Sequence, residues 1–250
     1  MSRLAEMLSF VLDQNLGLPT SDEPWKSILI AAGIVASQTA DLAAIDEALA
    51  RHQPDIAYVP TADFHRIVRS GDDTYRGLAI ATSKFTGDPR QTSLLVVRAD
   101  DPATGWADLR GADYGYINTA CTSSYFSPAI LLARQGKERD GFLHLVAVPA
   151  WQGQIDAVVS KQVRATMVLE DVWRARPENA KDTKIIGQYD NCKPPVVIAR
   201  KGLDDGTRTM LLDALVAWVP DWSGVYGGLK PFYYADVHGF FHDLDQLPAR

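Results

Sequence analysis

Residues 118–125 of this 250-residue chain read Asn-Thr-Ala-Cys-Thr-Ser-Ser-Tyr, a run dominated by small hydroxyl, thiol and amide side chains. Residues 114–117 before the run suit a short buried strand, and residues 126–134 after it suit a helix that Gly136 would cap. A polar loop at a helix N-terminus binds anions, because unpaired N–H groups and the positive dipole end face the ligand. The hydroxyl groups of the run would add donors. The simpler interpretation is a helix cap rich in Ser and Thr, with no ligand.

The elements that must position this loop follow from the hydrophobic pattern. Short apolar segments alternate with amphipathic ones, which predicts an α/β fold with mainly parallel sheets. Residues 4–12 have apolar side chains at helical spacing, so the first element is predicted to be a helix. Further helices are predicted at 41–52, 61–70, 126–134, 152–161, 170–175, 207–218 and 234–244, and strands at 28–32, 55–59, 75–83, 93–98, 114–117, 143–148, 165–169, 184–187 and 195–200.

Composition excludes several classes of protein. A chain that is 46% hydrophobic and 22% charged has the composition of a globular protein. The net charge of −6 and the lack of a basic run argue against a nucleic-acid partner. No apolar stretch reaches the roughly 18 residues of a membrane-spanning helix, so no membrane insertion is expected. No nucleotide-binding glycine motif occurs, and we expect no cofactor.

Cysteine and histidine residues offer weaker signals. Cys121 and Cys192 are too few for a disulfide framework or a zinc site, and they leave a single bridge between them as an open alternative. His238 and His242 have a spacing that can place both on one helix face, but no third ligand is evident, so no metal is predicted.

Four short motifs occur in a characteristic order: Asp-Ile-Ala at 55–57, Asp-Leu-Arg-Gly at 108–111, Cys-Thr-Ser-Ser-Tyr at 121–125 and Arg-Lys-Gly-Leu-Asp at 200–204. With their flanking segments, they resemble the phosphonate/phosphate/phosphite-binding proteins of ABC importers, which have the type II periplasmic binding protein fold. The resemblance covers about residues 40–216.

The resemblance implies a two-lobe α/β protein in which each lobe is a mainly parallel sheet flanked by helices. Lobe one would comprise residues 1–92 and 201–250, lobe two would comprise residues 93–200, and the ligand cleft would lie between them. It also implies a solute-binding protein, not an enzyme. Such a protein captures a small anionic ligand bearing a phosphonate, phosphate or related oxyanion, with an ABC permease as its possible partner.

The loop carries the ligand contacts that the resemblance implies. Thr122 and Ser123 match the pair whose hydroxyl and N–H groups hold phosphonate oxygens, and Tyr125 is retained. A thiolate beside a bound anion would be repelled, so the thiol that replaces the family's first serine is expected to be neutral. The departures from the family pattern, which we still expect at the ligand, are Asn118 for Asp, Cys121 for Ser and Ser124 for Gly.

Further contacts are expected outside the loop. Where the family has a ligand-binding His, this chain has Trp151, followed by Gln152, which suggests a ligand with a flat or apolar part. Ordinary packing between lobes is the alternative for Trp151. Tyr58 and Thr61 follow a strand C-terminus of lobe one, where open α/β sheets place ligands, although Tyr58 could instead pack in the core.

The start of the chain departs from the family. The family begins with a strand, whereas a helix is predicted here from the outset, so the first strand of lobe one would be missing. The simplest explanation is that the sequence begins after that strand and an export signal. The resemblance implies a periplasmic protein, and a complete start would imply a cytoplasmic one.

Two other classes of protein remain open at this point. One is a cytoplasmic enzyme on the same scaffold, of the menaquinone- or thiamine-precursor type. The other is a ligand-sensing module. No acid–base pair is evident near the expected cleft, which argues against the enzyme.

Overall fold

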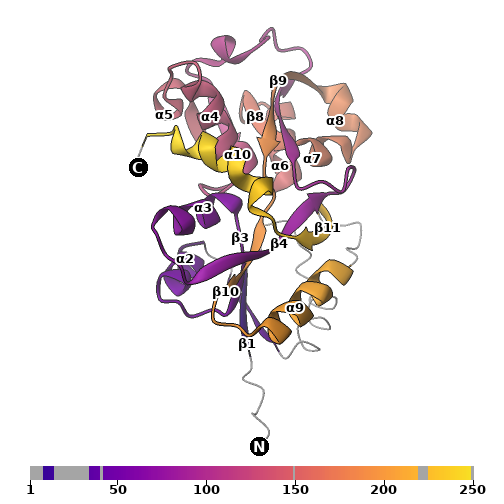
Figure 1. Ribbon diagram of the computed structural model, residues 1–250. Coiled ribbons are helices and arrows are strands. Elements are labelled where there is room, and N and C mark those ends of the chain that lie inside the picture. Colours follow the sequence, from indigo (N-terminus) through magenta and orange to yellow (C-terminus); the bar gives the residue numbers. More distant parts are fainter. Residues whose placement is uncertain (1–7, 14–33, 40–41, 149, 219–224, 249–250) are drawn as a thin grey trace, which may run out of the picture. The chain divides into compact units, whose positions relative to one another are not determined.

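A computed structural model describes residues 8–13, 34–39, 42–148, 150–218 and 225–248 of the chain (Figure 1). The predicted strand at 28–32 lies outside these residues. The chain divides into two compact units. The first comprises Met1–Pro89 and Pro194–Asp236, and the second comprises Arg90–Lys193 and Val237–Arg250. Within these described ranges, each unit contains one sheet. None of the helices in the described ranges is long and apolar enough to cross a membrane.

The first unit is built on a six-stranded mixed sheet in the order β11-β4-β10-β3-β1-β2. β1 pairs in parallel with both β2 and β3, while β10 is antiparallel to β3 and β4 and β11 is antiparallel to β4. The expected common direction therefore holds for β1 to β4, and the strands that return late in the sequence oppose it. The strands are β1 (Leu8–Asp13), β2 (Ile34–Thr39), β3 (Ile56–Val59), β4 (Tyr75–Ser83), β10 (Val196–Arg200) and β11 (Tyr226–Pro231).

The beginning of the chain corrects two predictions. Residues 8–13 form strand β1, so the predicted helix over 4–12 is wrong for these residues, and lobe one does not lack its first strand. β1 pairs with β2 from Leu8↔Ile34 to Asp13↔Thr39, and its other edge pairs with β3. Apolar spacing within the segment is compatible with a helix, but hydrogen bonds on both edges come from distant residues and override local preference.

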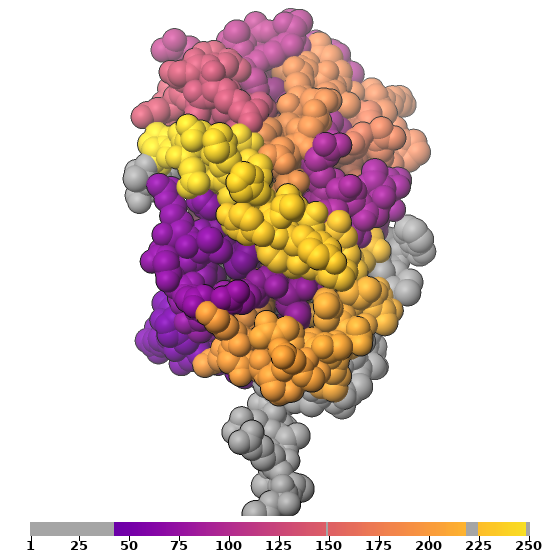
Figure 2. Space-filling model, in the orientation of Figure 1, coloured from indigo at the N-terminus to yellow at the C-terminus, as the bar shows by residue number. Residues whose placement is uncertain are grey.

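In the part of the first unit that the structure describes, three helices lie wholly within the unit: α2 (Leu42–Ala50), α3 (Thr61–Arg69) and α9 (Asp205–Ala217). All three were predicted within a few residues. α9 begins at Asp204, whose carboxylate accepts a hydrogen bond from the Thr207 N–H group at 3.0 Å and caps the helix. It packs against β4 and β11, buries Leu211 and Leu215, and exposes its other side (Figure 2, orange).

The second unit has a five-stranded sheet in the order β7-β6-β8-β5-β9. β6 is parallel to β7 and β8, whereas β5 runs antiparallel to both β8 and β9. Here too the strand directions are mainly parallel, with one opposing strand inserted. The strands are β5 (Gln91–Arg98), β6 (Asp113–Tyr116), β7 (His144–Ala147), β8 (Ala165–Leu169) and β9 (Thr183–Cys192).

Helices flank this second sheet (Figure 1). The predicted helix at 126–134 begins earlier than expected, with a π-helical turn, and α5, α8 and the first-unit strand β11 were not predicted. The helical elements are η2 (Trp106–Leu109), η3 (Thr122–Phe126), α4 (Ser127–Ala133), α5 (Arg139–Phe142), α6 (Trp151–Val159), α7 (Glu170–Arg174), α8 (Pro177–Asp182) and α10 (Tyr234–Asp245).

The observed unit boundaries differ from the predicted lobes at three places, the first being residues 90–92, which group with the second unit and not with the first. Residues 194–200 group with the first unit, and residues 237–250 group with the second, not the first as predicted. Asp243 of α10 explains the last of these differences, because it accepts hydrogen bonds from Tyr189 at 2.6 Å and Asn191 at 3.2 Å and pairs with Arg134 at 2.6 Å. These partners lie far away in sequence, so the amphipathic pattern of α10 did not reveal them.

Candidate anion-binding site

The loop after β6 is the centre of the candidate site. The N–H groups of Tyr125 and Phe126 both donate to the carbonyl of Cys121, each at 3.1 Å, and close a turn around the three residues between. The N–H group of Ser127 reaches back to the carbonyl of Thr122, which continues the wide i to i+5 pattern. A π-helical turn of this kind is rare and often occurs at functional sites.

Two backbone donors of this turn are available for a ligand. Among the described residues, the N–H groups of Thr122 and Ser123 have no hydrogen-bond acceptor. They stand at the first positions of a helical segment that continues through α4, where N–H groups have no partner within the helix. The positive end of the backbone dipoles adds to their attraction for an anion.

The hydroxyl group of Thr122 is engaged within the second unit. It donates to the carbonyl of Lys193 at 2.9 Å and accepts from the thiol of Cys192 at 3.4 Å. The resemblance implied that this hydroxyl donates to the ligand, and in this structure its proton points to a backbone carbonyl instead.

Ser123 is fully buried, and its hydroxyl lies 3.3 Å from the sulfur of Cys121. A thiol holds a hydroxyl weakly, so this group can turn towards a stronger acceptor. The side-chain oxygen of Ser124 accepts from the N–H group of Ile117 at 3.1 Å, and that of Asn118 accepts from the N–H group of Ala120 at 3.0 Å. The last two side chains therefore shape the loop.

The Cys192 thiol was not predicted to belong to the site. Burial raises its pKa to about 12, despite hydrogen bonds that act in the opposite direction. It is therefore neutral at physiological pH and places no negative charge beside Thr122. Its only sequence signal was its residue type, because its contact with the loop joins residues 70 apart.

Tyr125 is the last residue of the loop, and an arginine side chain packs against it. The side chain is buried, and the centre of its ring lies 5.5 Å from the ring centre of Tyr116 and 5.4 Å from that of Phe126. Arg139, which the sequence did not single out, places its guanidinium 3.7 Å from the centre of the Tyr125 ring. It also donates to the Tyr125 carbonyl at 2.7 Å.

Of the two ligand contacts expected on α6, the structure leaves the polar group of Trp151 without a described partner and gives that of Gln152 partners within the unit. The indole N–H group of Trp151 is buried and has no hydrogen-bond partner among the described residues. Ala150, directly before it, has a φ of 77°, a conformation that is strained for a residue other than glycine. Gln152 instead uses its amide within the unit, donating to Asp156 at 3.0 Å and to Asn179 at 2.9 Å.

Tyr58 and Thr61 belong to the first unit, at and just beyond the end of β3. Both side chains are fully buried. The Thr61 hydroxyl donates to the carbonyl of Pro194. Their burial is compatible with the core alternative that the sequence left open for Tyr58.

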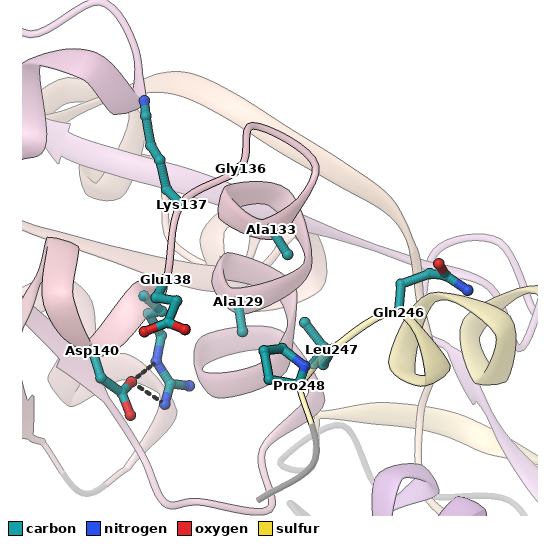
Figure 3. Close-up of a pocket in the computed structure, with 10 residues that line it drawn as sticks. Ala129, Ala133, Gly136, Lys137, Glu138, Asp140, Gln246, Leu247 and Pro248 are labelled. Atoms are coloured by element: carbon teal, nitrogen blue, oxygen red, sulfur yellow. Dashed lines mark hydrogen bonds and ion pairs between the residues drawn. The ribbon is translucent and has the colours of Figure 1, made fainter.

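A separate cavity of about 410 Å³ lies in the second unit beside α4, the start of α5 and the end of α10 (Figure 3). Its lining includes Ala129, Ala133, Arg139 and Leu247 but no residue of the loop at 118–125. The described residues contain no group of three His, Cys, Asp or Glu side chains able to hold a metal ion.

Comparisons with known proteins place this chain in a family. A family profile described as the periplasmic substrate-binding protein of phosphonate ABC transporters matches residues 32–226. No curated protein matches the chain in sequence.

Several solved structures share this fold. XAC2383 from Xanthomonas citri, bound to chloride ion, has a TM-score of 0.73 and 16% identity, covering 96% of this chain and 98% of its own. PhnD1 from Prochlorococcus marinus, in complex with methylphosphonate, has a TM-score of 0.71 and 12% identity, covering 96% and 99%.

A third structure is a binding protein component of an ABC phosphonate transporter from Pseudomonas aeruginosa. It has a TM-score of 0.71 and 16% identity, covering 95% of this chain and 85% of its own. At these identities the likeness shows the fold, and it confirms the two-lobe α/β prediction. Because the family profile spans most of the sequence, the chain belongs to the periplasmic substrate-binding proteins of phosphonate ABC transporters.

Proposed function

We propose that this chain binds a small oxyanion, such as a phosphonate or phosphate, through the N–H groups of Thr122 and Ser123 and the Ser123 hydroxyl. The observation that carries the proposal is the pair of backbone donors without acceptors at the start of a helical segment. Such donors need no reorganisation to receive an anion. The methylphosphonate complex of PhnD1, a protein of the same fold, supports this ligand class.

The charge around the loop suits an anion. The pKa of the Cys192 thiol is raised to about 12 by burial, so it stays neutral beside the bound ligand. Asn118 stands where the resembling proteins have an aspartate, so residues 118–125 carry no acidic side chain. In this proposal, Asn118 and Ser124 shape the loop, while the thiol of Cys121 lies behind the Ser123 hydroxyl.

We expect Trp151 to contact the organic part of the ligand. Its buried indole N–H group has no partner in the described part of the chain, and its ring provides an apolar face. We expect a ligand that combines an oxyanion with a flat or apolar group. Contacts of the ligand with Tyr58 and Thr61 remain a prediction, which Tyr58→Phe and Thr61→Val variants would test by ligand affinity.

A binding screen tests the oxyanion proposal. Phosphate, phosphite, methylphosphonate, phenylphosphonate, sulfonates and carboxylates are compared by thermal shift, and the hits are measured by calorimetry. A ligand that binds only the folded protein raises the melting temperature by mass action. The proposal predicts a shift with at least one phosphorus oxyanion and a loss of affinity in Ser123→Ala. If no oxyanion binds the wild-type protein, the proposal is wrong.

Ser160→Ala is the matched control for Ser123→Ala. Ser160 follows α6 in the same unit, and its hydroxyl donates only to the carbonyl of Ala157, at 3.3 Å. We expect this variant to bind like the wild type. Equal losses in both variants would point to a general effect on the unit.

We further propose that the protein serves transport and does not catalyse a reaction of its ligand. The chain delivers its ligand unchanged to an ABC permease, so phosphorus NMR of ligand recovered after long incubation should show the starting compound alone. Turnover of the ligand would favour the enzyme alternative. We also propose a periplasmic location, since the family is periplasmic, and cell fractionation tests it.

A further inference from the structure

Arg139, the first residue of α5, is a charged side chain buried beneath the loop. Only 3% of the residue is exposed, which is unusual for an arginine. Its Nη1 atom donates to the carbonyl of Tyr125 at 2.7 Å, and the guanidinium stacks on the Tyr125 ring at 3.7 Å. A planar guanidinium can make both contacts at once, whereas a lysine ammonium cannot.

The outer side of the same guanidinium pairs with Asp140, at 2.7 Å from Nε and 2.5 Å from Nη2 (Figure 3, dashed lines). The Asp140 side chain is 62% exposed, and exposed ion pairs contribute little to stability. The ion pair with Asp140 therefore does not explain why the arginine is buried. Its inner contacts with Tyr125 are what distinguish it from a surface arginine.

Tyr125 connects this arginine to the two backbone donors. Its N–H group closes the turn on the Cys121 carbonyl at 3.1 Å, and Thr122 and Ser123 lie inside that turn. A shift of Tyr125 would therefore change the direction of both N–H groups. The stack and the carbonyl bond hold Tyr125 from two directions.

We propose that Arg139 is a positioning residue that holds the π-helical turn in the geometry that receives an oxyanion. The inference rests on the proposed function of the loop and adds a residue that makes no ligand contact of its own. It acts by fixing Tyr125, so its loss should weaken binding of every oxyanion that uses the loop.

The cavity of Figure 3 gives this inference a direct test. Arg139 belongs to its lining, so we expect truncation to alanine to open the guanidinium position towards the cavity. A methylguanidinium ion added to the solvent can then enter and occupy that position. Measured well below the melting temperature of Arg139→Ala, where the variant is folded with or without the ion, rescue by this ion distinguishes a positioning role from a general loss of stability.

The experiment measures the affinity of the best oxyanion from the screen for the wild type, Arg139→Ala, Arg139→Lys and Asp140→Asn. We expect Arg139→Ala to lose affinity by roughly tenfold or more, as for loss of a charge-assisted hydrogen bond. Methylguanidinium, far below denaturing concentrations, should restore most of it, and tetramethylammonium at equal ionic strength should not. Arg139→Lys should lose affinity, and Asp140→Asn should retain it.

Arg134→Ala is the matched control, because this arginine directly follows α4 and pairs with Asp243, and in the described part of the chain it does not contact Tyr125. It should bind like the wild type. If Arg139→Ala binds like Arg134→Ala, or if methylguanidinium fails to rescue it, the inference is wrong. If Arg139→Ala does not fold, the comparison of Arg139→Lys with Asp140→Asn decides, and equal affinities overturn the inference.

These outcomes separate the two proposals. A wild-type protein that binds no oxyanion contradicts the proposed function before any variant is made. A wild type that binds, together with Arg139 variants that bind equally well, contradicts the positioning role alone.

Discussion

The hydroxyl group of Thr122 donates a 2.9 Å hydrogen bond to the backbone carbonyl of Lys193, across 71 residues of sequence. This carbonyl is the last of the second unit before the chain passes into the first, and the next one, that of Pro194, accepts a hydrogen bond from Thr61 within the first unit. The consecutive carbonyls of Lys193 and Pro194 thus each accept a hydrogen bond from a threonine of their own unit. The hydroxyl proton of Thr122 is therefore used in a hydrogen bond to the backbone.

Replacing Thr122 with valine keeps its shape and removes its hydroxyl. The carbonyl of Lys193 and the thiol of Cys192 would each lose the hydrogen bond with this hydroxyl, so we expect the free energy of unfolding of the ligand-free protein to fall by about 1–2 kcal/mol. Urea unfolding measures this loss. Thr122→Ser, which keeps the hydroxyl, should lose less.

The same variant tests how Thr122 serves the ligand. If its proton stays on Lys193, Thr122→Val should weaken oxyanion binding less than Ser123→Ala does. An unchanged stability together with a larger loss of affinity would show instead that the hydroxyl turns to the ligand.

The Cys192 thiol predicts a weakening of the fold at alkaline pH. Burial raises its pKa from an ordinary value of 9.0 to about 12, so above pH 9 the unfolded chain releases a proton that the folded protein retains. Stability is therefore unaffected by this group below pH 9 and falls as pH rises through the interval to about 12, by at most about 1.4 kcal/mol per pH unit.

The measurement compares wild type and Cys192→Ala by urea unfolding on both sides of pH 9. The difference between them should shrink above pH 9, because the variant lacks the thiol. Tyr75, whose pKa burial raises to about 12, is present in both proteins and cancels in the comparison. A constant difference across this range would contradict the assignment.

Asp243 should stabilise the second unit above its own pKa. Burial pushes its pKa upwards, but hydrogen bonds from Tyr189, Arg134 and Asn191 outweigh this effect and lower the pKa below its ordinary 3.8. The carboxylate thus stabilises the fold above pH 3.8, and this contribution is lost as pH falls through the lowered value. Asp243→Asn should destabilise the unit by about 1–3 kcal/mol at neutral pH.

Circular dichroism during urea unfolding at neutral and acidic pH would measure that effect. Tyr189→Phe removes one hydrogen bond and should cost less than Asp243→Asn. If Asp243→Asn is as stable as the wild type at neutral pH, these contacts do not hold α10 to the second unit.

Gly77 on β4 leaves space for an aromatic ring. An added Cβ atom would lie 2.3 Å from the Cδ1 atom of Phe232, whose ring also packs edge-on against Phe64 at 5.5 Å. We therefore expect Gly77→Ala to destabilise the first unit by about 1–3 kcal/mol. Gly202→Ala, with no atom within 4 Å of the added Cβ, is the control and should leave the melting temperature unchanged.

Much of the fold and the family followed from local patterns. Most strands and helices from residue 42 onwards were predicted in the right order, because periodic burial of apolar side chains is visible within each segment, whereas α5, α8 and β11 were missed. The loop at 118–125 was also recognisable locally, since its hydroxyl and thiol side chains lie between a predicted strand and a predicted helix. These features identified the family before any tertiary contact was known.

Contacts between distant segments decided the rest. β1 has helical apolar spacing, yet it is a strand because β2 and β3 supply partners on both its edges. Similarly, Lys193 and Cys192 occupy the Thr122 hydroxyl, and Arg139 holds Tyr125, through pairings that no local pattern records.

The sequence by itself therefore determined which donor groups the loop contains and which family it belongs to. Only the tertiary structure decided which of those donors lack a strong acceptor among the described residues, namely the N–H groups of Thr122 and Ser123 and the Ser123 hydroxyl. The physical reason is that a side chain's chemistry belongs to its own position, whereas the partner of a buried polar group is set by whichever distant segment packs against it.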